Sequence, residues 1–516
     1  MTDYVFGANI LENLTTGMYK DSKVVYREYI QNSCDQIDKA VKDCILEPDE
    51  STINIWLDRV KRTITIEDNA TGITAASFQR TLGNIAASDK KIGKDKGFRG
   101  IGRLCGLAYC NELIFSSSAK GENTISIMVC DAKKMRSLIE ENQRGKKLSA
   151  NEILHAINRF EQREADDPDS HFFRVELIDI NKENTDLLDF QQVKNYLSFV
   201  APVPYQNSFI YRSEVYEQAK NLGVRIDEYK ITLDAEQIFK KYTTDLKEPT
   251  GTKYDDIFGV HFKEFYDTDG GLIAWMWVGL SKFQKVIPKF NQMRGLRLRK
   301  ENIQIGGEDS LQKLFKEDRG NSYFVGEVFA VNKDLIPNSQ RDYFNENIAR
   351  ATFERELRKY FNEELHKIYY DGSAINSAYK KIDTYEKKEA EFKEKEASRD
   401  FVDKEHRENE LKSVIESRKT AETAHAQIEK MKNKADDPMK RVLNRIENDR
   451  VKPFTKEPNV FKEQSEDSKP SHRTDRLSQY SRPERKLISK IFSIILTTTD
   501  NETAERIISK VEEGLQ

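Results

Sequence analysis

The chain has 516 residues, which is enough for roughly two to four domains. Charged residues make up 33% of it, yet the net charge is only -3, so the body as a whole is not expected to bind polyanions. The N-terminal residues lack the basic region and apolar core of a secretion signal, and no apolar run approaches the ~20 residues that cross a bilayer. We therefore expect a cytoplasmic protein without a membrane partner.

Residues 1–200 have the pattern of a mixed α/β domain. A helical pattern covers residues 24–40, and alternating segments at 53–57 and 63–67 predict two strands joined by a basic turn. Residues 82–106 are rich in Gly, Lys and small side chains, which indicates a mobile segment. Further strands are expected at residues 113–115, 124–129 and 172–178.

A second α/β domain is expected over residues 201–372. Its clearest element is a hairpin, with strands at 258–266 and 272–280 around an Asp-Thr-Asp-Gly-Gly turn. An apolar strand at 323–331 and a helix at 349–370 complete the pattern.

The rest of the chain divides into three segments of different composition. Residues 373–452 are dominated by charged side chains and predict either a solvated helix or a coiled coil. Pro438 is expected to kink or end a helix there. Residues 453–483 predict a polar linker, and residues 484–516 predict two apolar-faced helices with Asp500 or Asn501 as the cap between them. The coiled-coil alternative depends on a short heptad run at Ala421, Ala424, Ile428, Met431 and Ala435.

The first segment that carries chemistry lies in the helix at residues 24–40. Glu28, Asn32 and Asp35 are spaced so that all three lie on one helical face. ATP hydrolysis needs a carboxylate base for the water and a neutral oxygen ligand for Mg²⁺, and this face supplies both. The alternative is an ordinary charged helix surface, which can show the same spacing.

The second segment follows the strand at residues 63–67. Asp68 stands at the strand end, where its carboxylate can accept a hydrogen bond from an adenine amino group. Gly72 lets the backbone pass close to a flat base. The alternative is a plain Asp-Asn turn after a strand.

The third segment is a GxxGxG run formed by Gly97, Gly100 and Gly102, ahead of an apolar helical pattern. Backbone amides in such a run suit contacts with phosphate groups. The run has no GKS or GKT sequence, so it is not a P-loop, and it lacks the strand and distant acidic residue of a dinucleotide-binding fold.

These three segments, in this order, resemble the Bergerat-type ATP site of the GHKL superfamily, which includes gyrase-type topoisomerases, the ninety-kilodalton heat-shock chaperones, histidine kinases and MutL. Within the superfamily, the sequences of residues 27–39 and 82–88 are most similar to those of the heat-shock chaperones. The resemblance implies an ATPase that uses ATP and Mg²⁺. It covers roughly residues 1–370.

The resemblance also implies a role for each residue of the three motifs. Glu28 would be the general base, Asn32 the magnesium ligand and Asp68 the adenine acceptor. Asp35 and Gly72 complete their motifs, and Gly97, Gly100 and Gly102 would contact phosphate through their amides. This chain departs from the family pattern at Ala70, which replaces a glycine, and at Phe172 and Phe173, where the family usually has a Gly-Thr pair near the adenine.

The second domain is similar to the transducer domain of the same superfamily. Residues 334–342 resemble the loop that delivers a cation to the γ-phosphate, and Arg341 is the candidate for that cation. The alternative is that Arg341 pairs with Asp342 or caps a helix. The fold expected for the whole chain is α+β, with a Bergerat-type sandwich, a transducer-like domain and a charged helical tail.

One basic segment, residues 282–300, contains no acidic residue. The pattern has three interpretations: a nucleic-acid contact, a solvated hairpin, or a segment in which Arg297 and Lys300 face the ATP site. Its seven basic residues are Lys282, Lys285, Lys289, Arg294, Arg297, Arg299 and Lys300.

Two functions remain open from the sequence. The first is an ATP-gated homodimeric clamp that acts on a protein client, as chaperones do, or on DNA, as MORC-like and MutL-like proteins do, with a bacterial defence role among the options. The second is a nucleotide-dependent interaction scaffold with negligible turnover. The apolar faces of residues 484–516 favour a dimer contact or a docked partner over a free helical pair, and the alternative is that they pack on the chain's own body.

Overall fold

The computed structural model describes residues 6–15, 17, 21–84, 102–398, 400–450, 477 and 479–515. It forms two compact units, the first made of residues 1–281 and 286–366 and the second of residues 282–285 and 367–516. Gly97 and Gly100 lie outside the described residues, as does most of the expected linker. No helix among the described residues is long and apolar enough to cross a membrane.

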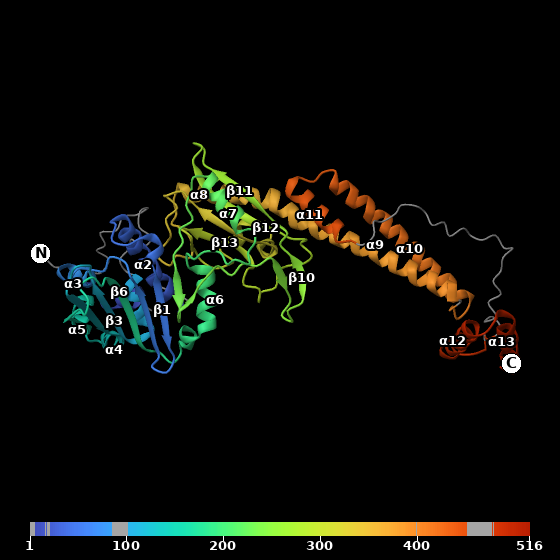
Figure 1. Ribbon diagram of the computed structural model, residues 1–516, viewed down its shortest axis with the longest axis horizontal. Helices are drawn as coiled ribbons and strands as arrows, with labels where there is room; N and C mark the ends of the chain where they lie inside the picture. Colours follow the sequence, from blue (N-terminus) through green and yellow to red (C-terminus); the bar gives the residue numbers. More distant parts are fainter. Residues whose placement is uncertain are drawn as a thin grey trace. The chain divides into compact units, whose positions relative to one another are not determined.

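The first unit begins with an eight-stranded sheet in the order β5-β4-β3-β6-β2-β1-β7-β8 (Figure 1). Neighbouring strands are antiparallel except β1 and β7, which are parallel. The expected strands and the hairpin with its basic turn are therefore confirmed. The strands are β1 (Ile53–Asp58), β2 (Thr63–Asp68), β3 (Cys110–Ser118), β4 (Thr124–Asp131), β5 (Asn158–Glu164), β6 (Phe172–Ile180), β7 (Ile231–Leu233) and β8 (Glu236–Gln237).

Helix α2 packs on this sheet and determines where the candidate site lies. Its apolar side chains recur every three or four residues at Tyr26, Ile30, Cys34 and Ile37, and all four are buried in one core with the sheet. Full burial of an aliphatic side chain such as Ile30 or Ile37 contributes roughly 1.5–3 kcal/mol. The helices of this region are α1 (Asn9–Leu14), α2 (Val24–Lys42), α3 (Ala75–Gly83), α4 (Ala132–Gln143), α5 (Ala150–Ile157), α6 (Phe190–Val200) and α7 (Arg212–Asn221).

A second, five-stranded sheet in the order β11-β12-β15-β13-β14 completes the first unit. The expected hairpin is confirmed as the antiparallel pair β11 and β12. Trp275 and Trp277 of β12 are fully buried in its core, and helix α8 (Ile348–Tyr360) follows the last strand. Strands β9 (Asp245–Lys247) and β10 (Lys253–Asp256) form a separate hairpin. The strands of the five-stranded sheet are β11 (Gly259–Tyr266), β12 (Leu272–Leu280), β13 (Gly295–Lys300), β14 (Ile303–Gln304) and β15 (Val325–Ala330).

The second unit is helical. Helices α9 (His366–Ser398) and α10 (Lys404–Lys432) form an antiparallel pair (Figure 1), and the heptad residues Ala421, Ala424 and Ile428 are buried between them. Helix α11 (Asp437–Asn448) begins with Pro438 in its first turn, so α10 ends ahead of this proline as expected.

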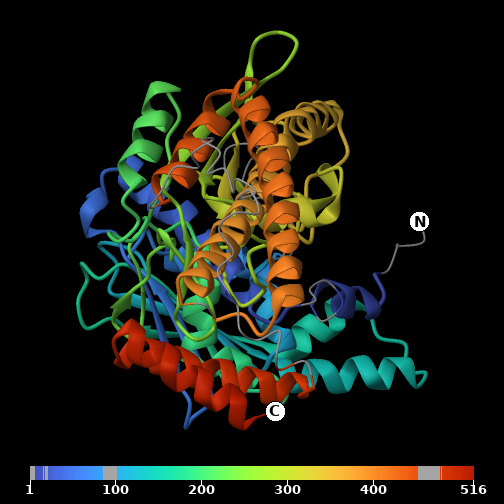
Figure 2. The same ribbon diagram turned by 90° about the vertical axis from the view of Figure 1, so that its right-hand side faces the viewer.

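The chain ends in a pair of helices, α12 (Arg482–Thr498) and α13 (Asn501–Gly514), which lie side by side (Figure 2). Asp500 is the cap between them, because its side chain accepts a hydrogen bond from the Thr503 amide. Phe492 and Ile508 are buried where the two helices meet.

Candidate functional site

Helix α2 presents Glu28, Asn32 and Asp35 on one face, as the spacing predicted. Glu28 and Asp35 are each 7% exposed, and Asn32 is half-buried. Burial of two carboxylates on one helix is costly unless charges or hydrogen-bond donors surround them. An ordinary solvated helix surface does not have this arrangement.

Two arginines surround the Glu28 carboxylate. Arg27 Nη2 lies 3.1 Å from Glu28 Oε1, and Arg341 Nε lies 3.7 Å from the same oxygen. Arg27 Nη2 also donates a hydrogen bond of 3.2 Å to the Gln340 carbonyl. The loop after β15 is thereby held against the start of α2. The motif analysis assigns no role to Arg27. Its position directly before the candidate base Glu28 is the sequence feature that could have identified it.

The backbone at Gly102 passes directly against Glu28. A Cβ atom at this position would lie 2.5 Å from Glu28 Oε2, so only glycine fits without a shift of the carboxylate. The residues that follow form a short 3-10 turn, η2 (Gly102–Ala108), which leads into β3 and replaces the longer helical run that the sequence pattern indicated.

Asp68 ends strand β2 and is almost fully buried. Its Oδ1 accepts a hydrogen bond of 3.1 Å from the Ala70 amide. Gly72 has a φ of 63°, and a Cβ there would lie 1.8 Å from the Ser118 carbonyl oxygen. The close approach of two backbones at the end of β3 therefore requires glycine at this position, in addition to any contact with a base.

Phe173 lies directly opposite Asp68 in the sheet, where the family's Gly-Thr pair was aligned. Its ring stacks on Phe115, with 6.1 Å between the ring centres. The nearby hydroxyl of Ser117 accepts a hydrogen bond from the Ile73 amide and donates one to the Phe172 carbonyl, each of 2.8 Å. The residue opposite Asp68 in the sheet is therefore an aromatic side chain that packs on Phe115.

Arg341 lies in the loop between β15 and α8. Its backbone has a φ of 54°, and its carbonyl accepts a hydrogen bond of 2.8 Å from the Gly306 amide. Asp342 Oδ1 accepts from the Asn338 side chain at 2.5 Å. This strained conformation is held by its neighbours and directs the Arg341 guanidinium towards Glu28.

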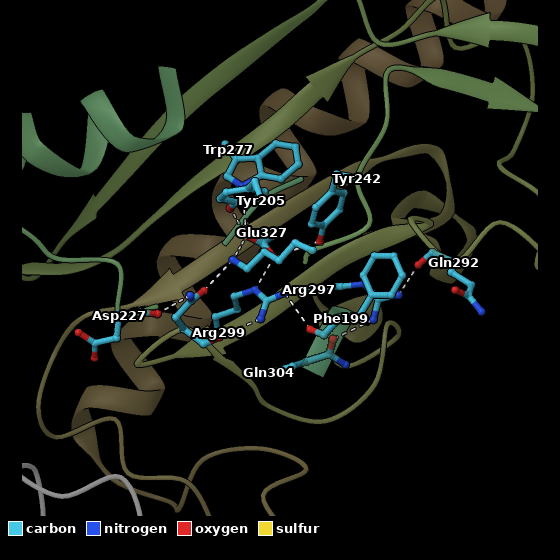
Figure 3. A network of polar contacts seen from close by, with 12 residues as sticks. Phe199, Tyr205, Asp227, Tyr242, Trp277, Gln292, Arg297, Arg299, Gln304 and Glu327 are labelled. Carbon is cyan, nitrogen blue, oxygen red and sulfur yellow. Dashed lines mark hydrogen bonds and ion pairs between the residues drawn. The ribbon is translucent and has the colours of Figure 1, made fainter. Parts of the chain in front are cut away.

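Three of the seven basic residues of segment 282–300 are internal. Arg297 donates to the Gln304 side chain and the Gln292 carbonyl, and its guanidinium stacks on the Phe199 ring (Figure 3). Lys300 Nζ donates to the Asn332 carbonyl at 2.8 Å. Arg297, Arg299 and Lys300 are all buried, so they are not available to a nucleic acid, and their contacts are not with Glu28.

Arg299 belongs to a buried polar network at the centre of the second sheet (Figure 3). Its Nε pairs with Glu327, whose other oxygen accepts from Lys240 Nζ at 3.0 Å. Burial alone raises the pKa of Glu327, but the two cations and a hydrogen bond from Tyr205 bring it down to about 2. Burial and the charge of Arg299 lower the pKa of Lys240 to about 7.

Residues 19–165 match the family described as histidine kinase-, DNA gyrase B-, and HSP90-like ATPase. The chain is 35% identical over 96 residues to the chaperone protein HtpG of Methylibium petroleiphilum, covering 17% of this chain and 15% of the relative. It is 28% identical over 131 residues to the same chaperone from Escherichia coli O1:K1, covering 22% of this chain and 21% of the relative.

The chain therefore spans less than a quarter of the length of these relatives. The matched region contains α2, Asp68 and η2, which are the parts that surround Glu28. The N-terminal region of this chain belongs to the histidine kinase-, DNA gyrase B- and HSP90-like ATPases, the GHKL superfamily.

Proposed function

We propose that this chain hydrolyses Mg-ATP on the α2 face, with Glu28 as the general base. The observation that carries the proposal is the surroundings of the Glu28 carboxylate, which lies between two arginines and the backbone of Gly102. A buried carboxylate next to a main-chain segment suited to phosphate can take a proton from a water aimed at the terminal phosphate.

The remaining motif residues would hold the nucleotide. Asn32 lies about one helical turn beyond Glu28 and offers a neutral amide oxygen, which fits the preference of Mg²⁺ for hard oxygen ligands. When bound, Mg²⁺ neutralises phosphate charge. Asp68 would accept from the adenine amino group. The other proposed nucleotide-binding residues are Asp35, Gly72, Gly97, Gly100 and Gly102.

Arg341 would supply the cation for the transferred phosphoryl group. In the present arrangement its guanidinium is 3.7 Å from Glu28, within reach of the place where a terminal phosphate and the attacking water would meet. A cation there stabilises the charge that develops in the transition state. Because Arg341 belongs to the second sheet's loop, hydrolysis would depend on how that loop docks on α2.

The direct test is Glu28→Ala against wild type, with Glu140→Ala as control, since Glu140 is an exposed glutamate on α4. We expect Glu28→Ala to bind ATP normally but to hydrolyse it ~10²–10⁴-fold more slowly, and Glu140→Ala to match wild type. Wild-type turnover in Glu28→Ala would refute the base. Negligible turnover in wild type, with ATP-dependent binding of a partner, would favour the scaffold alternative.

The nucleotide cycle would drive a homodimeric clamp that acts on a protein client. The named relatives are chaperones, and burial of Arg297, Arg299 and Lys300 removes three cations from segment 282–300, the candidate for a nucleic-acid contact. Cargo captured by the Glu28→Ala variant in ATP, compared for protein and DNA content, distinguishes a client from a nucleic-acid partner. Recovery of DNA alone would support a MORC-like role, including bacterial defence.

A further inference from the structure

Tyr29 follows Glu28 on α2, and its hydroxyl group binds the backbone of the η2 turn. The hydroxyl donates a hydrogen bond of 3.0 Å to the Arg103 carbonyl and accepts one of 3.2 Å from the Gly106 amide. The side chain is only 2% exposed, so water does not compete for these bonds. Burial also keeps the pKa of this phenol well above its usual range, so the group remains a neutral donor.

Two glycines allow η2 to approach α2 this closely. A Cβ at Gly102 would lie 2.5 Å from Glu28 Oε2, and a Cβ at Gly106 would lie 2.4 Å from the Tyr29 hydroxyl oxygen. Consecutive residues of α2 therefore contact the two glycines near the ends of one short turn. The hydroxyl group of Tyr29 thus contacts the same short turn whose first residue, Gly102, lies against Glu28.

The same turn is tied to a third element by the Arg103 side chain. Its guanidinium donates to the Thr81 carbonyl at 2.8 Å and to the Asn84 carbonyl, both at the C-terminal end of α3. Tyr29 holds the carbonyl of this arginine, so one hydroxyl group connects α2, η2 and the end of α3. A tyrosine that merely fills the core would not need both of these backbone partners.

We propose that Tyr29 is a positioning residue, which sets the distance between the Gly102 backbone and the Glu28 carboxylate where the attacking water and terminal phosphate must fit. This inference rests on the proposed role of Glu28 as base. Beyond that role, it states that turnover requires the hydroxyl group of Tyr29 and not only its ring. The hydroxyl group acts through the backbone of η2 and not through contact with the nucleotide or the attacking water.

The test compares Tyr29→Phe with Tyr26→Phe. Tyr26 is a matched control on the same helix, fully buried, whose hydroxyl donates to the Leu187 carbonyl at 2.5 Å, away from η2. We expect Tyr29→Phe to lower kcat at least ~10-fold with a much smaller change in KM, because misplaced reacting groups lose rate more than affinity. Tyr26→Phe should keep wild-type kcat while losing comparable thermal stability.

A double-mutant cycle with Glu28→Ala shows whether Tyr29 acts through the base. We expect Tyr29→Phe to have no further effect on kcat once Glu28 is alanine. Three outcomes would overturn the inference while leaving the role of Glu28 intact. The first is that Tyr29→Phe lowers kcat as much in the Glu28→Ala background as in wild type. The others are a wild-type kcat in Tyr29→Phe, and an equal loss of kcat in Tyr29→Phe and Tyr26→Phe. Wild-type turnover in Glu28→Ala would overturn both proposals.

Gly106→Ala provides a second disruption of the same contact if Tyr29→Phe fails to fold. The added methyl group collides with the Tyr29 hydroxyl, so kcat should fall as in Tyr29→Phe. Gly7→Ala is its control for turnover, because Gly7 is exposed, its backbone lies outside the left-handed region and nothing lies within 4 Å of an added Cβ. Full activity in Gly106→Ala would contradict the inference.

Discussion

Arg341 Nε lies 3.7 Å from Glu28 Oε1, so the loop after the second sheet reaches the carboxylate on the first long helix. Arg27 connects the same two regions, because its guanidinium contacts both Glu28 and the Gln340 carbonyl. The negative charge of Glu28 is therefore balanced by two cations: Arg27 on its own helix and Arg341 on the loop that follows β15. Any rearrangement of the loop changes the surroundings of the proposed base.

Arg341→Ala should reduce turnover by at least ~10²-fold with little loss of ATP affinity, because the cation acts on charge that develops in the transition state. Steady-state hydrolysis together with calorimetric ATP binding separates these effects. Arg355→Ala is the control, since Arg355 is exposed on α8. Normal turnover in Arg341→Ala would remove it as the catalytic cation, whatever its effect on stability.

Asp68→Asn should weaken ATP binding ~10-fold or more, because a charged acceptor for the adenine amino group becomes a neutral amide. The Ala70 amide can still donate to the remaining carbonyl oxygen, so the fold should survive. Calorimetry compares it with Asp58→Asn, at the end of the neighbouring strand, where the side chain accepts only from its own exposed turn. Equal affinities in both variants would exclude the adenine role.

Lys240→Met should change how stability depends on pH. The pKa of Lys240 is about 7 in the folded chain, whereas the ordinary value for lysine is 10.5, so between these values the unfolded chain binds a proton that the folded chain has released. Raising the pH through this window therefore favours the folded state in wild type. The free energy of unfolding in urea, measured at pH 7 and pH 9.5, should change more favourably with rising pH in wild type than in Lys240→Met. Buried thiols such as Cys110, whose pKa burial raises, act in the opposite direction, but they contribute equally to both proteins.

The control for this experiment is Lys241→Met, the exposed neighbour, which should keep the wild-type pH dependence. If the free energy of unfolding had the same pH dependence in Lys240→Met and wild type, Lys240 would be protonated equally in the folded and unfolded chains. The buried arrangement of Lys240 and Arg299 around Glu327 would then be more polar than its contacts indicate.

Sequence periodicity predicted the elements whose pattern is local. The helical face of Glu28, Asn32 and Asp35 follows from spacing alone, and the strand that ends at Asp68 follows from alternation. Strand β5 was missed because it is an exposed edge strand, rich in charged side chains, and therefore lacks the apolar alternation of the central strands.

Contacts between residues far apart in the chain could not be predicted in this way. Lys240, Arg299 and Glu327 meet only because three separate segments pack at one point, so the basic residues of segment 282–300 looked like surface charge. Tyr29 has no signal in the sequence beyond its place in the helix. Its two backbone partners in η2 become apparent only from the fold.

The exposed side chains of α12 concern the proposed homodimer. Leu487, Ile491 and Ile494 are largely exposed and recur every three or four residues, so they form one stripe beside the face that packs on α13. Exposed stripes of this kind favour association. Ile491→Asp should therefore convert a nucleotide-free dimer into a monomer, because a buried carboxylate without a partner costs several kcal/mol.

Light scattering without nucleotide measures the mass of wild type, Ile491→Asp and a chain truncated before residue 481. Arg506→Glu is the control, because it changes charge at an exposed position of α13 outside the α12 stripe. We expect a dimer for wild type and Arg506→Glu, and a monomer for the other two. A truncated chain that kept the dimer mass would show that the subunits meet elsewhere. A dimer mass in Ile491→Asp together with a monomer mass in the truncated chain would show that α12 and α13 associate through a face other than this stripe.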